Sequence, residues 1–227
     1  MLHRPRLPAH RGDYKAFLLT SKKRIIVFID GFNLYHAIDA LHKDHLKWLN
    51  LRSLSEAFSK NSTEQIETVY YFTALATWLP ECMQRHKAYI KALESQNVTT
   101  VFGHFKKKNV KCNVCQSKWI TREEKESDVN IAIYLLNEAH LDNFDKAFII
   151  TADSDLVPAI QMALDTFSEK EIVVLTPPNR YQIAREIRSK VETIKIREKH
   201  LKNNLLPAIL YNEDGTVMIK RPEKYKC

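Results

Sequence analysis

Short apolar segments alternate with amphipathic segments along most of this chain. The apolar segments are rich in Val, Ile and aromatic residues and end at turn residues, which predicts buried β-strands at 24–30, 67–75, 99–105, 146–153 and 171–177. Their apolarity is continuous rather than alternating, which is typical of parallel strands covered on both faces. The segments between them carry apolar residues at helical spacing, which predicts helices at 33–43, 80–95, 121–140, 154–167 and 180–190. This alternation predicts an α/β three-layer sandwich with a mostly parallel, Rossmann-like central sheet.

The ends of the chain read differently from its middle. Residues 1–23 are basic and lack an apolar core, so we expect a flexible arm rather than a signal peptide. The main domain is then expected at 24–200, with a short edge strand at 191–197. A C-terminal extension at 201–227 contains two β-like segments around Asp214-Gly215, which predicts a β-hairpin.

Composition excludes one way of binding phosphate. The 227 residues include only four glycines, well below the average of about 7%. Phosphate-binding P-loops and dinucleotide-binding turns both need clustered glycines, and these four are far apart. Gly31 directly follows a predicted strand, where we expect it to let the chain turn sharply.

Charge, hydropathy and cysteine content indicate what kind of partner and compartment to expect. The formal net charge is +8, which favours a polyanionic partner such as nucleic acid. No apolar segment approaches the roughly 18 residues of a membrane span, so no membrane association is expected. Only two of the four cysteines are close in sequence, which is typical of a reduced, cytoplasmic protein.

Acidic residues gather where predicted strands end. Asp30 ends the first strand, and Asp153 and Asp155 follow the fourth, while Asp128 lies in the predicted helix at 121–140. Sites in open α/β sheets form at the carboxyl ends of the strands, so these side chains are expected to share one cleft. That helix is expected to begin with a capping box, Thr-x-x-Glu.

Converging carboxylates either take up protons or bind cations. Mg²⁺ and Mn²⁺ favour oxygen ligands, and such ions can promote hydrolysis of a phosphodiester. A basic surface would hold the polyanion while the acidic pocket holds the metal. The alternative is that each Asp caps a helix or a turn, as Ser154 and Asp155 could do at the next helix.

Three acidic motifs, in this order, resemble those of the NYN domain family, the LabA-like branch of the PIN-type nucleases. RIIVFIDGFNLYHA resembles the opening motif, and EKESDVNIAIYLL and FIITADSDLVPAI resemble the second and third. The tail resembles the C-terminal extension of a bacterial subgroup, so the resemblance covers about residues 24–222. It implies a PIN-like fold and RNA cleavage that depends on Mg²⁺ or Mn²⁺.

The resemblance also implies roles for single residues. Asp30 matches the first-strand metal ligand and Asn33 its polar companion in the following turn. Asp128 matches the helix carboxylate, and Asp153 and Asp155 match the acidic pair after the fourth strand. We therefore expect Asp30, Asp128 and Asp153 to hold metal. Asp155 is expected to support a second ion or orient water, and Asn33 to position phosphate.

Two positions depart from the family pattern. Related motifs often have Gly where this chain has Glu126 and Ala152. The loop at Ala152 is expected to differ in shape, because Ala has less backbone freedom than Gly, and Glu126 is expected to add a solvent-facing acid nearby. Lys125 lies one turn before the helix carboxylate and is a candidate phosphate contact.

A basic insertion at 106–122 is the candidate RNA-binding element. Its cations could contact phosphates and its tryptophan could stack on a base, whereas the alternative is a solvated loop anchored to the core by that ring. The candidate nucleic-acid contacts are Lys106, Lys107, Lys108, Lys111, Lys118, Trp119, Arg122, Lys125 and Arg185.

The insertion also contains Cys112 and Cys115, spaced as in zinc sites. A structural zinc ion needs four ligands, and the nearest added candidates are His104, Cys82 and His86. A complete zinc site, a half-site shared across a homodimer and a plain thiol pair all stay open.

Together these patterns predict a metal-dependent endoribonuclease. The second hypothesis is a catalytically weak regulator that binds RNA or protein on the same fold. A small-molecule phosphatase is disfavoured, because the segment Asp-Gly-Phe-Asn lacks a second Asp two residues after Asp30.

Overall fold

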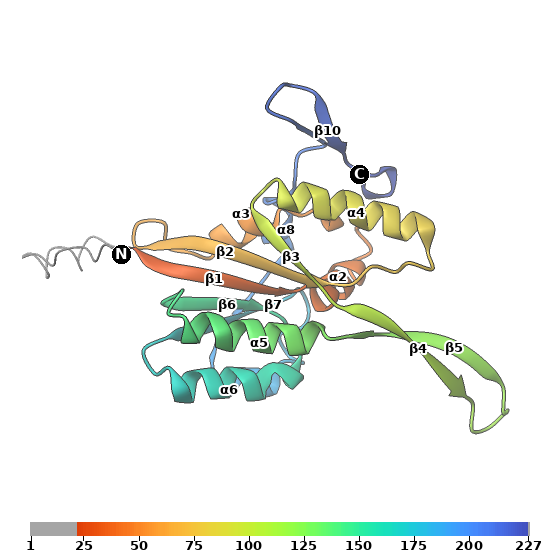
Figure 1. The fold of residues 1–227 in the computed structure, drawn as a ribbon, viewed down its shortest axis with the longest axis horizontal. Helices are drawn as coiled ribbons and strands as arrows, with labels where there is room; N and C mark the ends of the chain where they lie inside the picture. Colours follow the sequence, from red (N-terminus) through yellow and green to blue (C-terminus); the bar gives the residue numbers. More distant parts are fainter. Residues whose placement is uncertain (1–21, 227) are drawn as a thin grey trace, which may run out of the picture.

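The protein is built around a sheet of six parallel strands, seen here in a computed structural model that describes residues 22–226 (Figure 1). The order across the sheet is β3-β2-β1-β6-β7-β8. The strands are β1 (Lys23–Asp30), β2 (Glu64–Thr73), β3 (Val98–Phe102), β6 (Lys146–Ile150), β7 (Glu171–Thr176) and β8 (Glu192–Lys195). The predicted Rossmann-like sheet is confirmed, whereas all but the last two residues of the predicted arm at 1–23 lie outside the described residues.

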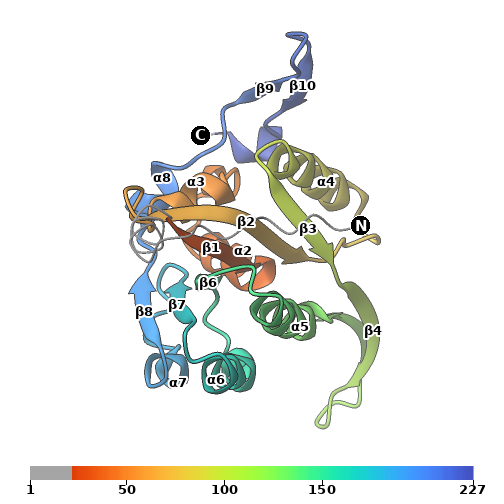
Figure 2. The same ribbon diagram turned by 60° about the vertical axis from the view of Figure 1, so that its left-hand side comes forward.

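Helices cover both faces of the sheet (Figure 2). One face packs against α2 (Gly31–Asp39), α3 (Leu51–Glu56), α4 (Pro80–Glu94) and α8 (Glu198–Lys202). The other packs against α5 (Ser127–His140), α6 (Val157–Thr166) and α7 (Arg185–Arg188). No helix within residues 22–226 is long and apolar enough to span a bilayer.

The central strand β1 shows why the sheet has two cores. Ile25, Val27 and Ile29 point into the core beneath α2 and α4, while Ile26 and Phe28 point into the core beneath α5 and α6. All five are at most 2% exposed, so each contributes roughly 1.5–3 kcal/mol of apolar burial. The continuous apolar pattern therefore arises, as predicted, because the strand is covered on both faces.

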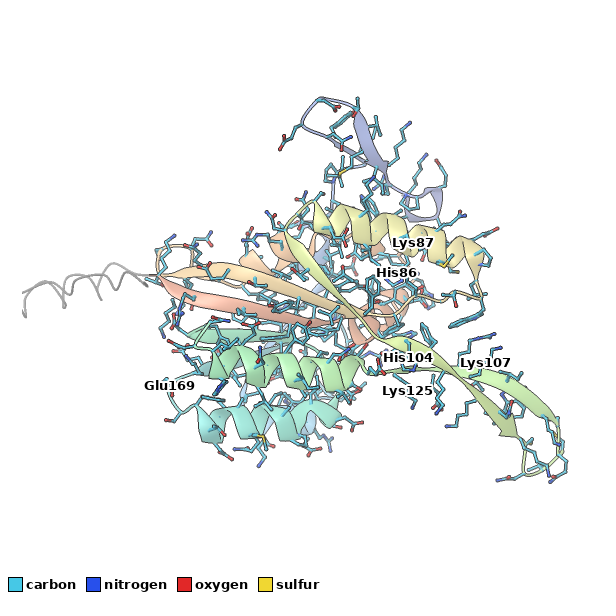
Figure 3. The ribbon with its side chains drawn as sticks, viewed as in Figure 1. His86, Lys87, His104, Lys107, Lys125 and Glu169 are labelled. Atoms are coloured by element: carbon cyan, nitrogen blue, oxygen red, sulfur yellow. The ribbon has the colours of Figure 1, made fainter. Side chains whose placement is uncertain are left out.

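The basic insertion is an antiparallel hairpin rather than a loop. Strands β4 (His104–Lys111) and β5 (Lys118–Lys125) pair only with each other and extend away from the body of the molecule, with His104 at the root and Lys107 further out (Figure 3). The prediction of one strand at 99–105 was wrong, because the chain leaves the sheet at Gly103. A Cβ at this glycine would lie 2.5 Å from the Lys125 carbonyl oxygen, so the two strands approach too closely there for any side chain.

The predicted start of the helix at 121 was also wrong. Residues 118–125 form β5, and α5 begins at Ser127 after Glu126, whose φ of 78° lies in the left-handed region. This is one of the two positions where related motifs often have Gly, which adopts such a φ without strain. The Thr-x-x-Glu pattern lies in a strand and is no capping box.

Shorter elements differ as well. The predicted helix at 180–190 is regular only in α7, and the predicted helix at 33–43 begins earlier and ends earlier, as α2. The chain does turn sharply after Asp30, because β1 is followed directly by α2, but Gly31 has no left-handed φ, so backbone freedom is not the reason for this glycine. It is needed for space, because a Cβ would lie 2.5 Å from the Phe72 carbonyl oxygen and 2.7 Å from the Tyr71 ring.

The predicted C-terminal hairpin is confirmed as β9 (Ile209–Tyr211) and β10 (Val217–Lys220), with Gly215 at a φ of 80° in the turn. A small apolar cluster fixes this extension to the domain through Trp48, Leu206 and Leu210. The Trp48 indole also donates to the Pro207 carbonyl oxygen at 2.9 Å. The extension is therefore packed on the domain.

Candidate active site

The candidate site lies where the order of the strands reverses. β1 pairs with β2 on one side and with β6 on the other, so the crossovers run in opposite directions from this point. Ligands of open α/β sheets bind at such a switch point, at the carboxyl ends of the strands. Asp30 ends β1 and Asp153 follows β6, so the structure places these two aspartates on neighbouring strands as predicted.

Asp30 is held in place by two hydrogen bonds. Its Oδ1 accepts from the Asn33 backbone N–H at 2.9 Å, and its Oδ2 accepts from the Thr151 hydroxyl at 3.0 Å. Asp30 is only 4% exposed. Burial raises the pKa of its carboxyl to about 7, although both hydrogen bonds act to lower it. Repulsion from Asp128 and Asp153 raises the pKa further.

A short hydrogen-bond chain joins the two strand ends. The Asn33 side-chain oxygen accepts from the Ala152 backbone N–H at 3.0 Å, which leaves the amide nitrogen of Asn33 to donate elsewhere. The Asp153 N–H donates to the Thr151 hydroxyl at 3.1 Å. Thr151 therefore connects Asp30 with Asp153, a role that sequence reasoning missed although this residue precedes the Ala-Asp-Ser-Asp motif.

Asp128 reaches the site from the first turn of α5. It is half-buried, and burial raises its pKa to about 6, with repulsion from Asp153, Glu124 and Asp155 adding to the shift. Glu124 was missed as a site residue because it was assigned to the helix. It lies at the root of β5, where its Oε1 accepts from the Ser127 backbone N–H at 3.1 Å.

Some of these aspartates also cap helices, as the alternative hypothesis expects. Asp30 caps α2, and Asp153 caps the 3-10 turn Ser154–Leu156 by accepting from the Asp155 N–H at 3.0 Å. Capping by Asp153 occupies its Oδ1. Capping and a functional role are thus compatible, because the cap fixes the direction of the remaining oxygen.

The chemistry of this cluster fits a hard divalent cation. The five acids supply oxygen ligands, and the pKa values of Asp30 and Asp128 are raised chiefly by burial and further by repulsion from the neighbouring acids. The buried Ser127 hydroxyl beside them has no hydrogen-bond partner among the described residues. Across residues 22–226, no three His, Cys, Asp or Glu side chains form a ready-made metal cluster.

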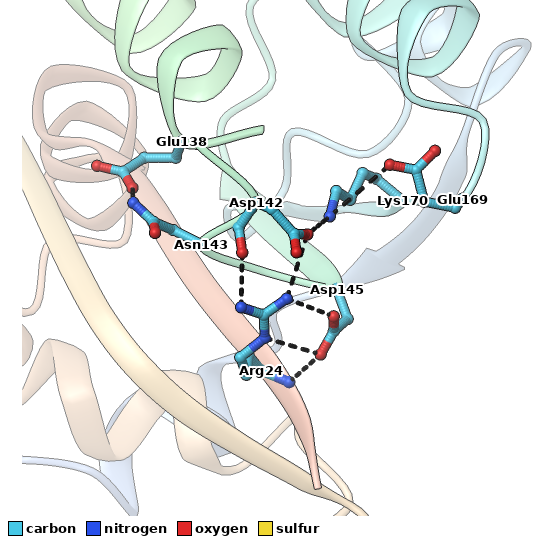
Figure 4. Close-up of polar contacts among 7 residues, drawn as sticks. All are labelled: Arg24, Glu138, Asp142, Asn143, Asp145, Glu169 and Lys170. Atoms are coloured by element: carbon cyan, nitrogen blue, oxygen red, sulfur yellow. Dashed lines mark hydrogen bonds and ion pairs between the residues drawn. The ribbon is translucent and has the colours of Figure 1, made fainter. Parts of the chain in front are cut away.

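The opposite, amino end of the same strands has the reverse arrangement (Figure 4). The Arg24 guanidinium binds Asp145 at 2.8 Å and Asp142 at 3.3 Å, and the Arg24 backbone N–H donates to Asp145 at 2.7 Å. Lys170 forms a further ion pair with Asp142. These contacts hold the pKa of both aspartates below the usual range, chiefly through hydrogen bonds from the two cations.

The candidate RNA-binding residues divide between two faces of the hairpin. Cross-strand pairing places Phe105, Lys107, Lys111, Lys118, Arg122 and Glu124 on one face, which we call the inner face because residues at its root line a cavity beside the carboxylates. The outer face carries Lys106, Lys108, Trp119, Glu123 and Lys125. Glu123 forms ion pairs with Lys108 and Lys125, whereas no ion pair of Lys107, Lys111 or Lys118 occurs among the described residues.

Five of the nine predicted nucleic-acid contacts lie apart from this inner face, namely the four on the outer face and Arg185. Trp119 is 48% exposed on the outer face, so it does not anchor the insertion to the core. Arg185 lies in α7, next to the edge strand β8, whereas the hairpin follows β3 at the other edge of the sheet. The structure thus brings together the carboxylates and only part of the predicted basic set.

The cysteine pair lies at the exposed tip of the hairpin, between β4 and β5. The Cys115 N–H approaches the Cys112 sulfur at 3.5 Å, and hydrogen bonds from Ser117 lower the pKa of the Cys115 thiol to about 7. Within the described part of the chain no third ligand completes a zinc site. A zinc site shared between two copies stays a prediction, which the zinc content and oligomeric state of the purified protein would test.

Comparisons with known proteins agree with this geometry. The family model of the NYN domain matches residues 24–196. A 6-hydroxy-3-succinoylpyridine 3-monooxygenase, HspA, from Pseudomonas putida is 24% identical over an alignment of 189 residues, and the match covers 68% of this chain. The chain spans 59% of the length of that relative. A crystal structure of a protein of unknown function, VPA0982, from Vibrio parahaemolyticus is similar with a TM-score of 0.52 and 16% identity, over 82% of this chain and 98% of that one.

Proposed function

Because the chain belongs to the NYN domain family, we propose that it is a metal-dependent endoribonuclease. The family is a branch of the PIN-like nucleases, and membership supports a ribonuclease-type function. The observation that carries the finer proposal is that acidic side chains from the carboxyl ends of β1 and β6, from the start of α5 and from the root of β5 lie close enough to repel one another.

Each side chain has a role that follows from its contacts. Asp30, Asp128 and Asp153 would hold Mg²⁺ or Mn²⁺, and Asp155 would support a second ion or orient water. Asn33 is fixed through its oxygen, so its amide nitrogen is available to donate to a phosphate oxygen. A divalent ion bound here would supply an activated water and stabilise the leaving oxygen of the phosphodiester.

RNA would be held by the inner face of the hairpin. Its lysines lie on the same face as Arg122, which lines the cavity beside the carboxylates, and Glu124, whose charge acts on Asp128. Contacts of this kind act on phosphate and depend on salt rather than on sequence.

Cleavage of labelled single-stranded RNA in Mg²⁺ or Mn²⁺ tests the carboxylates. Asp30→Asn and Asp153→Asn should each reduce the initial rate by at least about a hundredfold, since metal-held charge stabilisation supplies several kcal/mol. Asp165→Asn, on the exposed side of α6, is the matched control and should cleave at the wild-type rate. Undiminished cleavage by both site variants would rule out this assignment.

The same assay separates the enzyme from the regulator. RNA bound equally well in EDTA and in Mg²⁺, without cleavage of any RNA tested, would favour the binding module over the nuclease.

A pair of double variants tests the hairpin. Lys107→Ala with Lys111→Ala should weaken RNA binding about tenfold in low salt and lower the salt dependence of log K by about 1.4, as expected for two phosphate contacts to a single strand. Lys108→Ala with Lys125→Ala removes the same charge from the outer face and should have a smaller effect, because Glu123 already neutralises part of it. Equal effects of both pairs would show that the hairpin binds RNA without a preferred face.

A further inference from the structure

A cavity of about 530 Å³ opens beside the carboxylates, and no role described above uses it. It is framed by α2, α4, the loop after β2, the root of the hairpin and Tyr225 near the C-terminus. Its volume falls within the roughly 300–1,000 Å³ typical of sites for small ligands.

The walls of the cavity are largely aromatic. Phe32 and Phe105 meet edge to face with ring centroids 5.4 Å apart, and Tyr71 meets Tyr89 in the same way at 6.1 Å. Tyr35 is 42% exposed on α2 and also lines the cavity. Rings arranged in this way offer flat apolar surfaces to a flat guest, since aromatic pairs prefer stacked or edge-to-face contacts.

The lining also carries charged side chains, which are Lys47, Arg85, Arg122 and Glu124, and one neutral polar pair. The Nε2 atom of His86, which projects from α4 toward the sheet (Figure 3), lies 3.2 Å from the Thr73 hydroxyl. Burial lowers the pKa of His86 to about 4, so its ring is neutral near pH 7 and offers one donor and one acceptor. Such a pair recognises the polar edge of a neutral ring better than it recognises a charge.

The cavity adjoins both the carboxylates and the inner face of the hairpin. Gly31 and Phe32, which line it, directly follow Asp30. On the other side, the Arg122 guanidinium stacks 4.3 Å from the Trp78 ring, which meets Phe105 at 4.7 Å. A strand running from the hairpin to the carboxylates would therefore pass the mouth of this cavity.

We propose that this cavity binds one nucleobase of the RNA strand whose backbone crosses the carboxylates, an inference that rests on the proposed function. A nucleobase has the flat apolar faces that the rings would contact and the neutral polar edge that His86 and Thr73 would bind. Its phosphate would remain outside, toward Arg122 and Asp30.

The test measures binding rather than cleavage. A short fluorescent RNA is titrated with the full chain in EDTA, and the titration is repeated with RNAs that lack the base at one position each. One position should lose about tenfold in affinity, as expected for the loss of one base stacked on aromatic side chains, and the other positions much less.

Ala76→Trp fills the cavity from the loop after β2 and completes a double-mutant cycle. It should weaken binding of the intact RNA to the level of the sensitive abasic RNA, and removing that base should then have no further effect. Ala57→Trp, at the exposed end of α3, is the matched control. His86→Leu keeps roughly the size of the side chain and removes its hydrogen bonds. It should lower the affinity for the intact RNA, and the loss of affinity on removing a base at any of the other positions should stay as in the wild type.

Additive effects of base removal and of cavity filling, or no effect of either, would overturn the proposal. It would also be overturned if free nucleosides or hydroxypyridines bound the wild-type protein but not Ala76→Trp, while Ala76→Trp bound RNA as tightly as the wild type. The cavity would then be a small-molecule site. If the double-mutant cycle shows the expected coupling but no RNA is cleaved, only the nuclease assignment is contradicted.

Discussion

The two ends of the β1–β6 strand pair place the same residue type in opposite electrostatic settings. At the amino end, Asp142 and Asp145 lie against Arg24 and Lys170, and their pKa values are lowered. At the carboxyl end, acidic side chains lie against one another, and the pKa of Asp30 is raised.

The difference separates stability from function within one pair of strands. Ionised aspartates favour the folded chain at the amino end because cations and a backbone N–H bind them. At the carboxyl end ionisation opposes folding, and the unpaired charge is available to a ligand. Functional sites commonly keep such locally unfavourable arrangements, which the rest of the fold offsets.

The largest expected effect is that of Asp30→Asn on the free energy of unfolding in EDTA. The difference between the folded pKa of about 7 and the usual 3.8 corresponds to about 4 kcal/mol. Because the folded pKa is raised, protonation of Asp30 favours the folded state. This stabilisation is complete below pH 3.8 and is lost as pH rises through about 7. The variant should therefore match the wild type near pH 4 and exceed it by up to that amount above pH 7, as measured by denaturant titration at each pH. A constant difference between the two proteins at all pH values would contradict the raised pKa.

The second effect is that of a divalent ion on the wild-type protein. Mg²⁺ or Mn²⁺ at a hundredfold excess over its Kd should raise the free energy of unfolding by about 3 kcal/mol at pH 8. Asp30→Asn and Asp128→Asn should lose most of this gain, whereas the amino-end variant Asp145→Asn should keep it. Equal stabilisation of all three variants would place the ion elsewhere.

A third effect concerns the amino end. Asp145→Asn should destabilise the protein by about 1–2 kcal/mol at pH 7, because Arg24 loses its charged partner while the side chain is only partly buried. The pKa of Asp145 is lowered, so the wild-type advantage is present at neutral pH and disappears as pH falls below about 4. A stability difference that grew instead toward low pH would show that the two ends do not differ in sign.

The smallest effect should come from an exposed ion pair near the same end. Lys23→Gln removes the contact with Glu171, whose side chain is half-exposed, and should change the free energy of unfolding by less than about 0.5 kcal/mol. A loss as large as that of Asp145→Asn would mean that general surface charge, rather than the contacts of Arg24, stabilises this end.

The sheet was predictable because its strands are buried on both faces. Continuous apolar segments are typical of parallel strands covered on both faces, and the carboxyl ends of such strands are where sites form. Asp30 and Asp153 were accordingly found from sequence.

The hairpin was not predictable in the same way. β4 and β5 consist largely of exposed Lys and Glu, so they lack an apolar pattern, and their partners are cross-strand residues that local periodicity does not reveal. This is why Glu124 was assigned to a helix. Thr151 was missed because a single hydroxyl at a strand end carries no pattern.

Glu126 sets how the hairpin joins the rest of the domain. It is the one residue between β5 and α5, and Asp128 follows it by two positions. Its side chain also pairs with His104, the first residue of β4, at 3.1 Å, and Gly103 just before His104 packs against the Lys125 carbonyl oxygen. The start of α5, and with it the carboxylate of Asp128, is therefore fixed to the root of both hairpin strands.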